Sequence, residues 1–350
     1  MVIRSGTSIS AQRNRTAAAP QPRRNVLIEG EHPMVVLEDL AARPRPDAHI
    51  IVLANEKGGV GKSTVAFHTC MALCDQGFKV AAVDLDFRQQ SLARVLAFRE
   101  ATARRLGIEL PSPQYTAMHH TSGALLCQEL ARVGWHADYI VIDVAGHDSP
   151  LARRAIALAN TLVTPVNSSF VDLDLLGRFN PSTQELLGPG FFANMVNELR
   201  EERLRRDMGT IDWVVMQNRV RRGISNNQAR VDGALQCLAP RAGFRLGQGL
   251  TERVAYRELF LLGLTHLDLR HIPDLSHMRA QARDEIFGLL EDMGLPRPDA
   301  PGAPGARALD EAAHLAAEAL AAAQAQSSLA HSSQGSTTRA LAAHRSEASA

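Results

Sequence analysis

Short apolar runs alternate with amphipathic stretches through the middle of the chain. Runs with the composition of buried strands are expected at residues 50–54, 79–86, 138–143, 162–166 and 211–219. Apolar residues at helical spacing lie between these runs and predict helices from 65 onward and at 89–107, 123–133, 170–176 and 191–206. The stretches 110–122 and 181–190 are expected to be loops. Strands that alternate with helices predict an α/β fold, a doubly wound, mostly parallel sheet with helices on both faces.

Composition divides the chain into three parts. Residues 1–47 are expected to be a disordered basic arm, in which the apolar patch at 25–42 is either a short docking element or part of a passive tether. The arm's Arg-, Ser- and Ala-rich composition is also typical of an organellar transit peptide. Residues 48–295 have the apolar content of one folded domain. Residues 296–350 are expected to be a disordered Ala- and Ser-rich tail with a weak helix at 306–326.

Charge and cysteine usage restrict the function classes. The formal net charge is +1, so any nucleic-acid surface must be a local patch. No apolar run has the length of a membrane span. The cysteines lack the spacing of a zinc site and are interpreted as reduced core thiols; they are Cys70, Cys74, Cys127 and Cys237. We therefore expect a cytoplasmic protein. A membrane anchor would be a basic, bulky amphipathic C-terminal helix, whereas the tail has Asp310, Glu311 and Glu318 among alanines, so membrane binding is not expected.

A glycine-rich turn separates the first apolar run from the first helical stretch. It departs from the usual phosphate-binding loop at Glu56, where that motif begins with glycine. Converging backbone N–H groups bind phosphate oxygens, a lysine adds a point charge, and a hydroxyl can ligate a metal ion. We expect Lys62 to serve the β- and γ-phosphates of a nucleoside triphosphate and Ser63 to serve Mg²⁺. The residues expected to bind the nucleotide are Gly58, Gly59, Val60, Gly61, Lys62, Ser63 and Thr64.

Lysine usage points to the same loop. Of the 38 basic residues only Lys57, Lys62 and Lys79 are lysines, and the first two lie in the loop. A chain that otherwise uses arginine keeps lysine where a compact ammonium group is required. The alternatives are compositional coincidence or a solvated Lys57.

Carboxylates end two of the predicted strands. Asp84 and Asp86 follow one strand, where they either position water or Mg²⁺ beside a triphosphate or cap the next helix. Asp143 ends another strand as a Walker B aspartate does, and is expected to reach Mg²⁺ directly or through water. Gly146 would let the backbone approach a γ-phosphate, so we assign Asp84 and Gly146 to switch segments.

The last predicted strand leads to Asn218. Its amide can donate and accept at an adenine edge, or it can simply form a turn. Seven arginines lie between positions 221 and 257, and such clusters bind DNA phosphates without reading sequence. Because the whole chain prefers arginine, the cluster is equally typical of its composition. The candidate DNA contacts are Arg230 and Arg253.

Several unusual strings occur together in one order. The loop at 57–64, the acids at 84–86, Asp143 and Asn218-Arg219 together resemble the ParA/MinD group of deviant Walker A P-loop ATPases. Within this group the chain resembles the MipZ family, regulators of the division plane, over residues 50–295. The strings that carry this narrower resemblance lie at 55–57, 84–89, 164–172, 212–215 and 243–260.

The resemblance implies an ATP-driven monomer–dimer switch with slow, Mg²⁺-dependent hydrolysis. Lys57 would cross to the partner's phosphates, Asp86 would orient the hydrolytic water, Asp143 would be the Walker B acid, and Asn218 would contact adenine. The ATP dimer would bind nucleoid DNA nonspecifically, meet a ParB-like centromere-binding protein and inhibit FtsZ assembly away from midcell. Val144 and Ala145 replace the Thr-Pro of the family's second switch segment.

Three alternative functions share the loop. A ParA-type ATPase would partition a chromosome or plasmid with the same chemistry. A metabolic P-loop ligase would phosphorylate a small acid, but the sequence has no further acid–base constellation to serve one. A nucleotide-binding scaffold would not need the acids Asp86 and Asp143.

Overall fold

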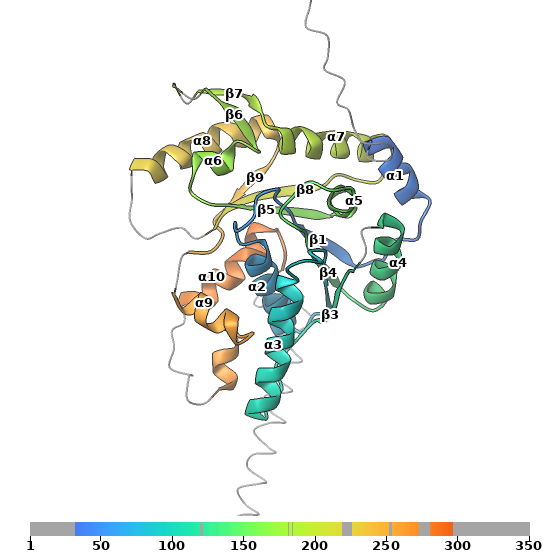
Figure 1. Ribbon diagram of the computed structural model, residues 1–350, viewed down its shortest axis with the longest axis vertical. Coiled ribbons are helices and arrows are strands. Elements are labelled where there is room, and N and C mark those ends of the chain that lie inside the picture. Colours follow the sequence, from blue (N-terminus) through green and yellow to red (C-terminus); the bar gives the residue numbers. More distant parts are fainter. Residues whose placement is uncertain are drawn as a thin grey trace, which may run out of the picture.

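A seven-stranded parallel sheet forms the centre of the protein, shown as a computed structural model in Figure 1. The structure describes residues 32–119, 122–180, 182–183, 185–218, 226–251, 254–272 and 281–296. The strand order is β3-β2-β4-β1-β5-β8-β9, so the chain winds outward from β1 in both directions. The strands are β1 His49–Leu53, β2 Val80–Asp84, β3 Gln114–Ala117, β4 Tyr139–Asp143, β5 Thr161–Val166, β8 Asp212–Gln217 and β9 Arg245–Gly247. The predicted doubly wound α/β fold is confirmed.

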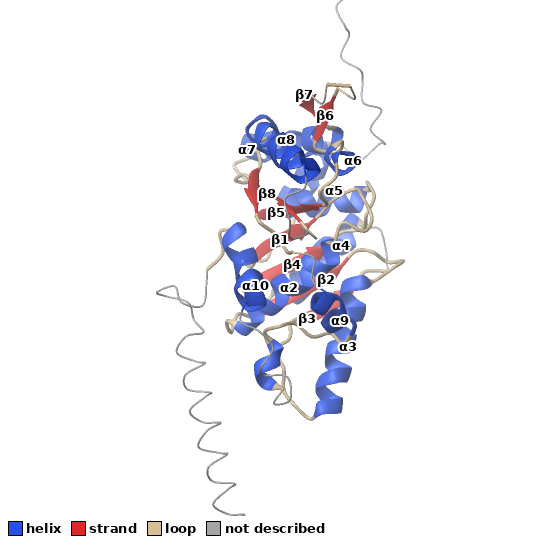
Figure 2. Ribbon diagram, turned by 90° about the vertical axis from the view of Figure 1, so that its left-hand side faces the viewer, coloured by secondary structure: helices blue, strands red, loops and turns tan. Residues whose placement is uncertain are grey.

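Helices cover both faces of the sheet (Figure 1 and Figure 2). One layer consists of α1 Pro33–Ala41, α4 Gly123–Gly134, α5 Pro150–Leu158, α7 Phe191–Arg205 and α8 Asn226–Ala242. The other consists of α2 Lys62–Asp75, α3 Ser91–Leu106, α9 Val254–Leu261 and α10 Gln281–Asp292. Along β1, Ile50 and Val52 enter the first core, whereas Ile51 and Leu53 enter the second. Because a strand alternates its side chains between two buried faces, the central strands are continuous apolar runs.

Two regions expected to be loops contain short strands. β3 lies within the stretch 110–122 and pairs with β2 at the edge of the sheet. Its sequence Gln-Tyr-Thr-Ala forms no apolar run, because an edge strand is covered and paired less than a central one. An antiparallel hairpin of β6 (Gly177–Phe179) and β7 (Leu186–Pro189) overlaps the connection expected at 181–190. Periodicity did not reveal either element, because each is only three or four residues long.

The N-terminal helix α1 belongs to the folded domain. Val36, Leu37 and Leu40 are buried in the first core, and Asp39 forms an ion pair with Arg154 of α5. Part of the apolar patch thus forms a docked helix, as the first of the two alternatives expected. The end of the arm expected over residues 1–47 therefore belongs to the folded domain. The remaining arm residues 1–31 and the tail from residue 297 lie outside the described residues.

The structure also tests the expectation that all four cysteines lie in the core and the expectation that no segment spans a membrane. Cys70, Cys74 and Cys127 are buried free thiols, but Cys237 is exposed on α8, which corrects its assignment to the core. It faces outward because α8 packs on the sheet through Val231, Leu235 and Leu238 instead. Among the helices in the described part of the chain, none is long and apolar enough to cross a membrane.

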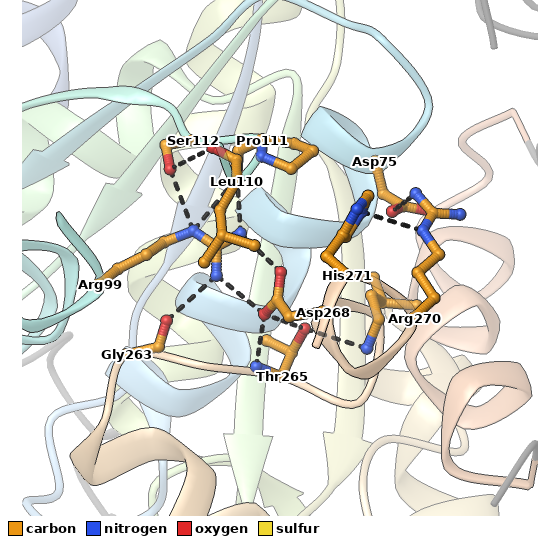
Figure 3. Close-up of polar contacts among 11 residues, drawn as sticks. Asp75, Arg99, Leu110, Pro111, Ser112, Gly263, Thr265, Asp268, Arg270 and His271 are labelled. Atoms are coloured by element: carbon orange, nitrogen blue, oxygen red, sulfur yellow. Dashed lines mark hydrogen bonds and ion pairs between the residues drawn. The ribbon is translucent and has the colours of Figure 1, made fainter. Parts of the chain in front are cut away.

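A buried ion pair fixes helix α3 to the segment that follows α9 (Figure 3). The guanidinium of Arg99 donates to Asp268 Oδ1 and Oδ2 at 2.6 and 2.8 Å. It also donates to the carbonyl oxygens of Pro111 and Gly263 at 2.7 and 3.1 Å and to Ser112 Oγ at 3.0 Å. Both partners of the ion pair are almost fully buried. A buried charge is tolerated only when it is paired and hydrogen-bonded, and this arrangement meets both conditions.

We expect Asp268→Ala to lower the free energy of unfolding by about 3–5 kcal/mol, because it leaves the Arg99 guanidinium buried without a counter-charge. Ser112→Ala removes one neutral acceptor from the same guanidinium and should cost only about 1 kcal/mol. Urea unfolding of both variants measures the difference. Equal losses for the two variants would contradict a charge-dominated network.

Candidate nucleotide-binding site

The register of the sheet places the predicted site residues side by side at the carboxyl ends of neighbouring strands. Leu53, the last residue of β1, pairs with Asp143 of β4, and Asp143 pairs with Asp84 of β2. The phosphate-loop sequence leaves β1 at this edge and helix α2 begins at Lys62. A pocket of about 360 Å³ opens here. Its lining residues are Gly58, Gly59, Gly61, Lys62, Ser63, Thr64, Asp86, Arg88, Gln89, Ser91, Asp143, Val144, Gly146, His147 and Phe260.

The loop has a conformation that requires glycine. Gly59 and Gly61 have φ angles of 77° and 94°, in the left-handed region that residues with a Cβ rarely adopt. Asn55 anchors the start of the loop, because its amide nitrogen donates to the carbonyl of Pro165 at 2.8 Å and its Oδ1 accepts the N–H of Lys57 at 2.9 Å. The anchored loop leads into the N-terminus of α2, whose free N–H groups favour an anion.

Lys62 and Gly146 close the base of the pocket. The Lys62 side chain is buried and its Nζ donates to the carbonyl of Lys57 at 2.9 Å. A Cβ at Gly146 would lie 3.0 Å from Gly58 Cα and 3.2 Å from Lys62 Nζ. The segment after β4 therefore touches the phosphate loop, as expected of a switch segment, and only glycine fits without displacing the lysine.

Asp143, the last residue of β4, is an almost fully buried acid. Burial and the neighbouring charge of Asp84 raise the pKa of Asp143 to about 8, while a hydrogen bond from Ser63 and the charge of Lys62 act in the opposite direction. Its Oδ1 has no hydrogen-bond partner. A buried carboxylate oxygen without a donor, next to a serine hydroxyl, fits the ligand preferences of Mg²⁺.

The two acids after β2 differ in their contacts. The carboxylate of Asp84 accepts N–H groups from Asp86, Leu92 and Ala93 at 2.9–3.1 Å and so caps helix α3. Asp86 accepts the N–H groups of Arg88 and Gln89 through Oδ1, at 3.2 and 3.0 Å, and lines the pocket. The capping interpretation therefore describes Asp84, while Asp86 holds a local turn at the wall of the pocket.

Lys57 points away from this pocket. Its Nζ forms an ion pair with Asp172 in the short helix α6 (Phe170–Leu173), and the Lys57 side chain remains 36% exposed. Asp172 is buried and also accepts the N–H of Asn167 at 3.1 Å. Sequence reasoning placed Asp172 only in the first turn of a helix and missed this pairing. The available signal was its position shortly after β5, the strand next to β1.

Asn218 reaches the loop from the end of β8. Its amide nitrogen donates to the carbonyl of Val60 at 2.9 Å and lies where a Cβ of Gly61 would be. The amide nitrogen thus contacts the loop itself, and the adenine contact that the resemblance implies stays a prediction. Of the candidate DNA contacts, Arg230 is exposed on α8 outside the pocket, and Arg253 lies outside the described residues.

Further pocket residues had received no role from the sequence. Arg88, Gln89 and Ser91 follow the strand-end acids closely, so their position after β2 was a usable signal. His147 similarly follows Gly146. Phe260 comes from α9 and packs edge-on against Phe67 of α2 at 5.5 Å between ring centroids, a proximity that no local pattern predicts.

Comparison with known proteins gives several matches to short stretches of the chain and one family match that covers most of it. A cytosolic Fe-S cluster assembly factor, CFD1 of Saccharomyces cerevisiae, is 49% identical over 47 residues, 13% of this chain and 16% of that protein. The iron-sulfur cluster carrier protein of Pseudomonas fragi is 30% identical over 118 residues, 27% of this chain and 41% of that protein. These matches span less than half of either relative.

Solved structures with a similar chain course include an ATP complex of McdA from Cyanothece, with a TM-score of 0.47 and 18% identity, covering 72% of this chain and 98% of that one. MinD of Pyrococcus horikoshii complexed with Mg-ADP has a TM-score of 0.45 and 17% identity, covering 70% and 95%. The sequence profile of the ATPase MipZ family matches residues 49–297, which is more than half of the chain. With that match, and with the loop and acids assembled as described, the chain belongs to the MipZ family of ATPases.

Proposed function

We propose that this protein is an ATP-dependent monomer–dimer switch that hydrolyses ATP slowly with Mg²⁺ and positions the division site. The observation that carries the proposal is the position of Lys57, the lysine of the phosphate loop that does not line the pocket. Lys62 serves the pocket of its own chain, whereas the Lys57 ammonium lies outside that pocket and is partly exposed. A loop lysine in this position is available to the phosphates of a facing copy.

Electrostatics links dimerisation to the triphosphate. Two facing triphosphates repel each other, and a lysine donated across the interface offsets part of that repulsion. In the single chain the same ammonium pairs with Asp172, so the buried carboxylate is not left without a counter-charge. Lys57 thus has two alternative anionic partners, and the nucleotide selects between them.

The pocket residues support a division of labour in hydrolysis. When bound, Mg²⁺ would neutralise phosphate charge, and Ser63 and Asp143 are the residues that would hold it. Asp86 at the pocket wall would orient the attacking water, and Gly146 brings backbone close to the loop where a γ-phosphate would lie. Loss of the γ-phosphate would remove the anion that holds Lys57 in the partner, which makes hydrolysis a timer.

Family membership supports the client side of the proposal. The ATP dimer would bind nucleoid DNA without sequence preference, contact a ParB-like centromere-binding protein and inhibit FtsZ assembly, acting in the cytoplasm on the nucleoid. DNA contacts would come from arginines such as Arg230 and Arg253. The second candidate is a ParA-type partitioning ATPase, which the same switch would serve with DNA cargo as its client.

We expect Lys57→Ala to bind ATP through Lys62 yet remain monomeric, because the charge donated across the interface is lost. Size-exclusion chromatography with ADP and with a slowly hydrolysed ATP analogue measures the change. The matched control is Lys79→Ala, which removes an exposed lysine outside the loop and should dimerise like the wild type. Normal ATP-dependent dimerisation of Lys57→Ala would remove the signature-lysine assignment.

We expect Asp86→Ala to bind ATP, dimerise and persist as a dimer, because water positioning is lost while the phosphate loop survives. A loss of two or more orders of magnitude in the hydrolysis rate is the scale for removing a positioned acid–base group, about 10²–10⁴-fold. Asp86→Asn keeps an acceptor for the turn at Arg88 and Gln89 and should be as slow. Wild-type hydrolysis by Asp86→Asn would assign the residue to the turn alone.

We expect the dimer formed with the ATP analogue to bind duplex DNA of any sequence, with an affinity that falls steeply with salt. Arg230→Ala should weaken binding equally across sequences and reduce the salt slope by about one for each phosphate that is no longer neutralised. Arg132→Ala, an exposed arginine on α4, is the control. Equal DNA affinity with ADP and with the analogue would refute the coupling of DNA binding to dimerisation.

A further inference from the structure

A groove outside the nucleotide site lies between the β6–β7 hairpin, α6 and α8. Its volume is about 580 Å³. The walls are largely apolar: Phe170 and Phe179 meet edge-on at 5.9 Å, and Leu187 is 62% exposed. The full lining is Phe170, Phe179, Glu185, Leu186, Leu187, Arg230, Gly233, Ala234, Cys237 and Arg241. Exposed apolar surface of this kind is typical of a binding site for another segment.

Charge is distributed along the groove in a definite way. Arg230 and Arg241 lie on one face of α8, eleven positions apart, which is about 16 Å along the helix axis. Between them α8 exposes only the small side chains of Gly233, Ala234 and Cys237 to the groove. The guanidinium of Arg230 lies over the Phe170 ring at 5.7 Å, and the one acid among the described lining residues, Glu185, accepts a hydrogen bond from Thr183 at 3.1 Å. The groove therefore favours a slender apolar segment that carries carboxylates.

One segment of this chain has that chemistry. Residues 306–326 consist mainly of alanine, with three leucines, three acids and one arginine. At helical spacing, Leu309, Ala316 and Leu320 share one face, and Glu311 and Glu318 lie on the opposite side. Small alanine side chains allow a close approach to Gly233 and Ala234. We propose that segment 306–326 docks in this groove as a helix, with Leu309 and Leu320 against the β6–β7 hairpin and Glu311 and Glu318 turned toward Arg230 and Arg241 of α8.

The exit of the chain from the domain lies near one end of the groove. Helix α10 ends beside the edge strand β9, because Arg245 donates to the carbonyl of Asp292 at 3.0 Å. Arg241 is four residues before Arg245, so the Cα atoms of the two arginines lie within about 14 Å of each other. The thirteen Cα–Cα steps from Pro296 to Leu309 can span up to about 45 Å. The segment can therefore reach the groove by passing the β9 edge of the sheet.

Tethering makes weak docking effective. A short alanine-rich helix is marginal alone in water and needs an apolar partner surface. A flexible tether of this length gives an effective concentration in the millimolar range. The docked state would therefore exceed the open state about tenfold if the intrinsic dissociation constant were one tenth of that effective concentration.

Cys237 provides a direct readout, because it lines the groove and is exposed while Cys70, Cys74 and Cys127 are buried. The rate at which a maleimide modifies Cys237 in the full chain measures how often the groove is open. We expect Leu309→Asp with Leu320→Asp, and separately Glu311→Lys with Glu318→Lys, to speed modification about five- to tenfold. The control Glu347→Lys, outside the segment, should leave the rate unchanged, and Cys237→Ser should remove the fast-reacting thiol.

A charge exchange separates docking from a general loosening of the fold. Arg241→Glu should also speed modification of Cys237, and combining it with Glu311→Arg should restore part of the protection. Unchanged rates in all segment variants would overturn the proposal. Protection that rises with protein concentration would assign the groove to a second copy, and protection that appears only with added duplex DNA would assign it to DNA; either result also overturns it.

Discussion

The structure depends on the crowding of charge at the carboxyl ends of β1, β2 and β4. Strand register places Asp143 next to Asp84, and the phosphate loop brings Lys62 to the same place. The one ammonium group does not neutralise both buried acids, as the raised pKa of Asp143 and its Oδ1 without a hydrogen-bond partner indicate. A polyphosphate with a divalent cation would complement both signs of charge at once. Gly146 follows from this constraint, because a Cβ there would lie 3.2 Å from Lys62 Nζ, whereas Gly61 is required by its left-handed φ angle and by the amide of Asn218.

In the proposed switch, Lys57 would give the loop a second state. A single ammonium on a flexible stem can exchange one carboxylate for a phosphate without rebuilding the loop, since Asn55 holds the backbone in place. The intramolecular partner, Asp172, is buried and would lose its counter-charge in that exchange. The energetic difference between the two arrangements is therefore sensitive to whatever stabilises or disturbs helix α6.

The remaining elements hold the pocket walls in place and connect them to other surfaces. Asp84 caps α3 at one end, while Arg99 fixes the same helix to the segment after α9 through a buried ion pair. Helix α3, which follows the pocket wall that carries Asp86, is thus held at its N-terminus by Asp84 and along its length by Arg99. On the opposite layer, α6 contributes Asp172 to the Lys57 ion pair and Phe170 to the groove beside α8, two residues apart. A segment docked in that groove, as proposed, would therefore contact the same short helix that holds the partner of Lys57.

Sequence alone predicted the five central strands of the sheet and the residues that line the base of the pocket, but not the edge strands β3 and β9. Central strands are apolar on both faces and the glycine-rich loop has a characteristic spacing, so β1, β4, Lys62, Ser63 and Asp143 could be placed without coordinates. Edge strand β3 and the β6–β7 hairpin could not, because strands of three or four residues are too short to carry a periodic signal. The roles of Asp84 and Asp86 were ambiguous for another reason: whether a strand-end acid caps a helix depends on where that helix begins. Only tertiary structure paired Lys57 with Asp172 and brought Phe260 and the α8 arginines to their sites, since contacts between residues far apart in the sequence are decided by packing and not by local pattern.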